Sequence, residues 1–92
     1  MPVRITHIRL GGPIPAHEYI TGLYWVEDGT GTTGTASSAE MVNWITNGNT
    51  AYVSDGQTAA IVHVIRPEGA LPFLRTQADG AWSDNLLALP HF

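Results

Sequence analysis

Apolar and polar residues alternate through much of the chain, which is the pattern of β-strands. The segment 3–10, VRITHIRL, is rich in β-branched residues and predicts a first strand. The segment 17–28, HEYITGLYWVED, predicts a second strand with two apolar faces, so we expect it in the centre of a sheet or under a partner. Three further strands are predicted over 50–54, 57–65 and 71–76.

A capping box marks the one helix that the sequence predicts. Ser37 and Glu40 have the S-x-x-E spacing in which each side chain bonds the other residue's backbone N–H. The helix ends at Asn47-Gly48, because glycine readily adopts the left-handed conformation that closes a helix. The preceding segment 29–38, GTGTTGTASS, predicts a flexible loop by its composition.

Turn signals complete the predicted fold. Asp55-Gly56 between two strand-like segments predicts a hairpin with a type I′ turn. Pro72, near the start of the last strand, predicts that this strand lies at an edge of the sheet. The predicted order is β-β-α-β-β-β. It indicates a single α+β domain over residues 1–92, with a small antiparallel sheet of about five strands and one helix on one face.

Charge and composition narrow the classes of partner. Eight acidic residues, four arginines and no lysine give a net charge of −4, so the chain lacks the many cationic contacts that duplex nucleic acid requires. The absence of cysteine excludes disulfides and thiolate chemistry. The sequence shows neither the apolar region of a signal peptide nor a run of about 20 apolar residues. We therefore expect a cytoplasmic protein with no membrane partner, and its thin core favours a homo-oligomer.

Four segments carry a resemblance to a known family. They are His17 to Thr21 (HEYIT), Ser37 to Glu40, Tyr52 to Ser54, and Leu74 to Pro90, which fits L-x-T-x-A-D-G-x-x-x-D-N-L-L-x-L-P. With these segments the chain resembles a family of small bacterial and phage proteins known only as a domain of unknown function. The resemblance covers most of the chain and implies relatives, but it implies no chemistry.

The C-terminal segment contains a candidate ligand site. Arginine pairs with phosphate, aspartate and asparagine bind hydroxyls or amides, and an indole stacks on a base. In the alternative interpretation Asp79-Gly80 is a turn, Asp84 caps a turn and Trp82 packs on the sheet. The sequence leaves both the ligand site and this structural interpretation open. The residues of the candidate rim are Arg75, Thr76, Asp79, Trp82, Asp84 and Asn85.

His17-Glu18 is a second candidate site. A histidine beside an acid can act as a general base or a metal ligand, and a metal would need Asp79 or Asp84 nearby. The alternative is a surface pair at the start of a strand. The glycines of 31–35 could form a lid, but no Lys-Ser/Thr follows them, so they are not a Walker loop.

Three functions are compatible with these residues. The first is a non-catalytic, homo-oligomeric small-molecule-binding protein with an anionic or nucleotide-like ligand and no cofactor, such as a phage protein that sequesters a nucleotide immune signal. The second is a protein-interaction module that docks a partner on strand 71–76 or on the apolar tail. A small hydrolase or metal enzyme built on His17 and Glu18 ranks last, because no nucleophile–base pair is visible.

Overall fold

The computed structural model describes residues 2–12, 16–54, 59–78, 81–83 and 86–92. Its strands form one sheet, and one α-helix follows the third strand. The elements, in chain order, are β1 (Val3–Leu10), the 3-10 helix η1 (His17–Tyr19), β2 (Ile20–Glu27), β3 (Thr33–Ser37), α1 (Ser38–Thr46), β4 (Ala51–Ser54), β5 (Ala59–Ile65), β6 (Phe73–Ala78) and β7 (Ala81–Ser83).

The sheet consists of two antiparallel meanders joined side by side. Its strand order is β3-β2-β1-β4-β5-β6-β7, and every neighbouring pair is antiparallel except β1 and β4. The parallel pair has a short register, Val3 with Ala51 and Arg4 with Tyr52. The prediction of a purely antiparallel sheet is therefore wrong. The helical connection carries the chain from β3 past β1, so that β4 enters the sheet parallel to β1.

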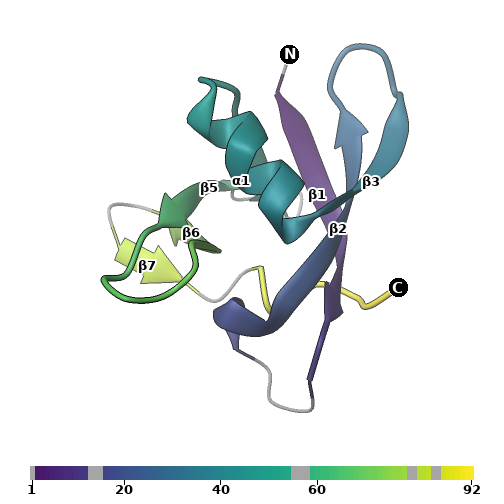
Figure 1. The fold of residues 1–92 in the computed structure, drawn as a ribbon. Helices are drawn as coiled ribbons and strands as arrows, with labels where there is room; N and C mark the ends of the chain where they lie inside the picture. Colours follow the sequence, from purple (N-terminus) through teal and green to yellow (C-terminus); the bar gives the residue numbers. More distant parts are fainter. Residues whose placement is uncertain (1, 13–15, 55–58, 79–80, 84–85) are drawn as a thin grey trace.

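The helix covers one face of the curled sheet, as predicted (Figure 1). It contacts β2 and β3 in one meander and β5 and β6 in the other. The apolar core lies between the helix and this face. Its most buried members are Val3, Ile5, Ile8, Ile20, Leu23, Met41, Val42, Ala51, Val53, Val62, Leu74 and Leu86.

The predicted helix boundaries are confirmed. Ser37 is the N-cap: its hydroxyl accepts a bond from the Glu40 N–H at 3.1 Å, and its own N–H donates to Glu40 Oε1 at 3.0 Å. At the other end Gly48 has φ 99°, the left-handed conformation that glycine adopts without steric cost. The N–H of Gly48 donates to the carbonyl of Ile45 at 3.0 Å. These contacts fix both ends of α1.

Several predicted elements differ in the structure. The segment expected as a flexible loop contains β3, which pairs along its length with β2. Residues 17–19 form η1 instead of the start of a strand. Among the described residues the sheet has seven strands, not about five, because β3 and the short β7 add to it. For β3 and β7, pairing with a neighbouring strand determines the element, and the pattern of apolar residues does not.

The predicted edge strand lies inside the sheet. β6 pairs with β5 on one side and β7 on the other, and Pro72 precedes its first residue, Phe73. Pro72 therefore removes no hydrogen bond from the sheet. The hairpin of β4 and β5 is confirmed by its antiparallel register, while its predicted Asp55-Gly56 turn lies outside the described residues.

The C-terminal residues extend the sheet where β1 and β4 separate. The Ile8 N–H donates to the Pro90 carbonyl at 3.0 Å, and the Phe92 N–H donates to the Ile8 carbonyl at 3.1 Å. His91 thereby forms a parallel bridge with Ile8. The guanidinium of Arg9 lies 4.6 Å from the centroid of the Phe92 ring. This segment occupies an edge of β1 that β4 leaves open.

Tyr52 connects the two meanders on the side of the parallel pair. Its hydroxyl donates to Asp28, with oxygen–oxygen distances of 2.7 and 2.9 Å. This bond to Asp28 raises the pKa of Tyr52 above its ordinary value of 10.0. Asp28 follows β2, and its N–H donates to the Pro2 carbonyl at 3.0 Å. The contact thus ties the end of β2 to β4.

We predict that Tyr52→Phe lowers the free energy of unfolding by about 1 kcal/mol near neutral pH, because a half-buried bond to a carboxylate is lost. The raised pKa of Tyr52 means that this contribution is complete below pH 10 and is lost as the pH rises through the raised value. Urea denaturation of both proteins across this range measures the difference. Tyr19→Phe, at an exposed tyrosine, is the control, and a difference independent of pH would contradict the assignment.

Candidate functional site

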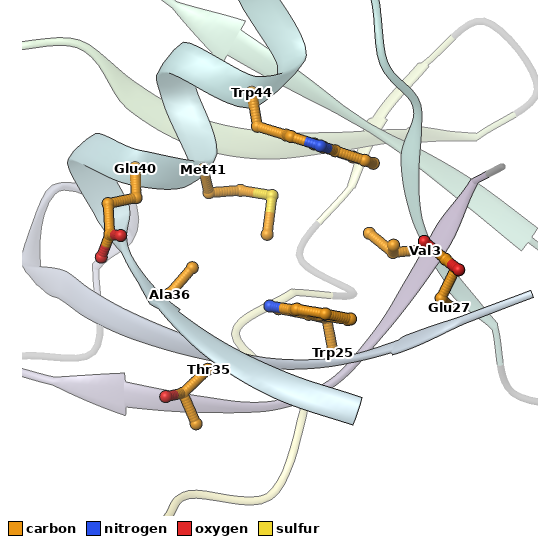
Figure 2. Close-up of a pocket in the computed structure, with 8 residues that line it drawn as sticks. All are labelled: Val3, Trp25, Glu27, Thr35, Ala36, Glu40, Met41 and Trp44. Atoms are coloured by element: carbon orange, nitrogen blue, oxygen red, sulfur yellow. The ribbon is translucent and has the colours of Figure 1, made fainter. Parts of the chain in front are cut away.

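A cavity of about 300 Å³ lies between α1 and the first meander. Figure 2 shows the indoles of Trp25 and Trp44 on opposite sides of it, with Met41 and Val3 between them. Val3 and Met41 are buried, whereas the two tryptophans are half-buried. The described residues that line it are Val3, Trp25, Glu27, Thr35, Ala36, Glu40, Met41 and Trp44.

Trp25 is placed by its neighbours across the strands. It lies opposite Ile5 on β1 and opposite Gly34 on β3. A Cβ atom at Gly34 would lie 2.5 Å from Cζ2 and 3.0 Å from Cε2 of the indole. The ring therefore lies directly over the backbone of β3, in space that any side chain at position 34 would occupy. Gly34 is thus the residue that allows Trp25 to form one wall of the cavity.

Trp44 forms the opposite wall from the last turn of α1. The Asn49 side-chain amide donates to the Trp44 carbonyl at 2.8 Å, which satisfies a carbonyl that the helix leaves open. Glu40 precedes Trp44 by four residues, so both lie on one face of the helix. The helix thereby presents an indole and a carboxylate to the same cavity.

Two carboxylates stand at opposite ends of the cavity in Figure 2. Glu27 Oε1 accepts a bond from the Thr30 hydroxyl at 2.9 Å. Glu40 accepts the capping bond from the Ser37 backbone, and this bond and the Ser37 hydroxyl lower the pKa of Glu40. Glu40 is therefore ionised at neutral pH. Hydrogen bonds fix the direction of both acids before any ligand arrives.

The arrangement suits the binding of a small molecule. Pockets for small ligands are typically lined by apolar and aromatic side chains with a few polar groups that set orientation. Here the walls are indole, thioether and aliphatic groups, and the polar groups are two carboxylates and the Thr35 residue at the rim. The volume of about 300 Å³ is at the small end of the range for such pockets.

Arg75 and Thr76 of the predicted C-terminal rim lie on β6, away from this cavity. Thr76 is fully buried in the core, whereas Arg75, next to it on β6, is half-buried. Successive residues of a strand point to opposite faces, so these two side chains do not face one ligand together. Trp82 belongs to β7, but its side chain is outside the described part, as are Asp79, Asp84 and Asn85. The rim that these residues would form stays a prediction.

The predicted pair His17-Glu18 lies in η1, where the two side chains have different environments. His17 is 8% exposed, whereas Glu18 is exposed and lines a second cavity of about 670 Å³ with Arg66 and the start of α1. Arg66 also donates to the Thr46 hydroxyl at 2.8 Å. Within the described ranges, no three His, Asp or Glu residues gather as metal ligands. None of the helices in those ranges is long and apolar enough to cross a membrane.

Comparison with known proteins identifies the family. The model of the family described as "Protein of unknown function (DUF3892)" matches residues 4–90. The chain belongs to the DUF3892 family. This match confirms the resemblance inferred from the HEYIT, S-x-x-E, Y-V-S and C-terminal segments. Neither the curated proteins nor the solved structures gave a match.

Sequence reasoning missed the cavity of this DUF3892 chain, although its residues carry a local signal. Trp25 and Glu27 are two apart on a strand, and Glu40 and Trp44 are four apart on a helix. Each spacing puts the acid and the indole on one face of its element. The register of β2 with β3 and the position of α1 bring the two pairs together, and neither could be read from spacing.

We predict that Gly34→Ala destabilises the protein by about 1–3 kcal/mol, because its Cβ would displace the Trp25 indole. The emission of the displaced tryptophan should shift as well. Gly22→Ala is a matched control on the neighbouring strand, where the added Cβ meets its nearest atoms at an ordinary 3.6 Å. Chemical denaturation followed by fluorescence compares them, and equal effects at both glycines would contradict the packing described for Trp25.

Proposed function

We propose that the protein binds a small molecule in the cavity between Trp25 and Trp44 and that it acts without catalysis. The observation that carries this proposal is the placement of two indoles on opposite sides of one cavity. Gly34 and the capped end of α1 hold these rings in position. A pre-formed aromatic site binds with little loss of conformational entropy, because its walls are already ordered.

The proposal keeps the small-molecule-binding function inferred from the sequence, but assigns it to the Trp25–Trp44 cavity instead of the C-terminal rim. The described lining of this cavity has no basic side chain, so it does not suit the anionic ligand expected from Arg75. Arg66 in the second cavity is the cationic group that an anion would meet there. The second cavity is therefore the alternative site, and Arg66→Gln separates the two in the experiment below. Self-association, expected from the thin core, is part of the proposal.

We predict that Trp44→Leu abolishes or strongly weakens ligand binding while the protein stays folded, since leucine keeps an apolar contact but loses the indole face. Native mass spectrometry of the protein purified from cells reports any retained small molecule and the subunit number. A retained adduct should be lost in Trp44→Leu and kept in Tyr19→Leu, which alters an exposed aromatic residue outside the cavity. An adduct lost only in Arg66→Gln would assign binding to the second cavity instead.

A further inference from the structure

The ionisable groups around the Trp25–Trp44 cavity have one sign. Glu27 and Glu40 are the acids of its lining, and no arginine or histidine belongs to that lining. The chain as a whole contains no lysine and carries a net charge of −4. The lowered pKa of Glu40 keeps its charge in place at neutral pH. A ligand in this cavity therefore experiences a negative potential from both ends.

The aromatic walls add to this potential. The face of an indole is the negative pole of its quadrupole and attracts a cation within about 6 Å of the ring centroid. In Figure 2 both indoles are seen nearly edge-on, so their faces point toward the space between them. One face of Trp25 is occupied by the backbone at Gly34, which leaves the other for the cavity. Met41 supplies a polarisable thioether beside them.

Three kinds of ligand can be compared on these grounds. An anion would meet two like charges and no cationic side chain of the lining, which opposes its binding. An uncharged apolar molecule would use the indoles but would draw nothing from the carboxylates. An organic cation uses both, because its charge is attracted by the ring faces and the acids, while its alkyl groups fill the apolar space.

We infer that the ligand is a small organic cation of the quaternary or methylated ammonium class, an inference that rests on the proposed function. Trp25 and Trp44 contact its alkyl groups, and Glu27 and Glu40 attract its charge from the two ends of the cavity. The hydrogen bonds from Thr30 and Ser37 hold these carboxylates in place before the cation enters. The cavity of about 300 Å³ limits the cation to a compact one.

The charge of the ligand can be tested with two probes of equal shape. Choline and 3,3-dimethylbutan-1-ol differ in the replacement of the quaternary nitrogen by carbon. We expect choline to bind about ten-fold more tightly, because cation–π attraction and the carboxylates act only on the charged probe. Titrations followed by the indole N–H signals in ¹H–¹⁵N spectra give both dissociation constants and show that the protein remains folded.

Isosteric variants then test the carboxylates. Glu27→Gln and Glu40→Gln remove a charge and keep an oxygen to accept the bonds from Thr30 and Ser37. We expect each to weaken choline binding about two- to five-fold and to leave 3,3-dimethylbutan-1-ol unchanged. Glu18→Gln, which removes an acid of the second cavity, is the matched control and should change neither constant.

The outcomes separate the cation from the cavity. Preference for choline that falls in the double variant Glu27→Gln/Glu40→Gln supports the inference. Equal binding of the two probes, both weakened in Trp44→Leu, would overturn the cationic ligand and leave the proposed binding function standing. Indole signals that respond to neither probe would overturn the inference, and an adduct retained by Trp44→Leu would overturn the proposed function with it.

Discussion

The packing of α1 across the junction of two meanders is the contact on which the rest of this structure depends. In the described residues, β1 and β4 of the two meanders pair over a short parallel register at Val3 and Arg4 of β1. The helix contacts β2 and β3 on one side of this junction and β5 and β6 on the other. Its buried residues Met41 and Val42 complete the core over both halves. A short parallel pair is therefore sufficient to join the two meanders, because the burial of apolar side chains beneath the helix also stabilises the junction.

The candidate site is a consequence of the same packing. The last turn of α1 places Trp44 on one side of the cavity, and Trp25, whose indole lies over Gly34 of β3, forms the opposite side. A glycine inside a strand costs about 0.5–1 kcal/mol, because it loses more backbone freedom on folding and has no side chain to pack. At Gly34 the indole of Trp25 covers the bare backbone and offsets this cost. The glycine at position 34 and the position of the Trp25 indole therefore account for each other.

The features that could be predicted are those whose cause lies within a few residues. The capping box of Ser37 and Glu40, the helix end at Gly48 and the strand 3–10 all follow from local side-chain and backbone chemistry. β3 could not be predicted in this way, because its glycine and threonines are typical of loops and its partners lie on β2. The position of β6 inside the sheet depends on β7, a strand of three residues that no periodicity reveals.

The site shows the same division between local and distant causes. The predicted C-terminal rim groups residues that are neighbours in the sequence. Successive residues of a strand point to opposite faces, and Arg75 and Thr76 on β6 therefore face opposite sides of the sheet. The cavity obeys that geometry, since it draws an indole and an acid from one face of β2 and the same two groups from one face of α1. The capping bond of Glu40 contributes to the fold and to the site: it begins the helix, and it holds a carboxylate that lines the cavity. Spacing within an element therefore identifies the pairs, and only tertiary packing decides which pairs meet.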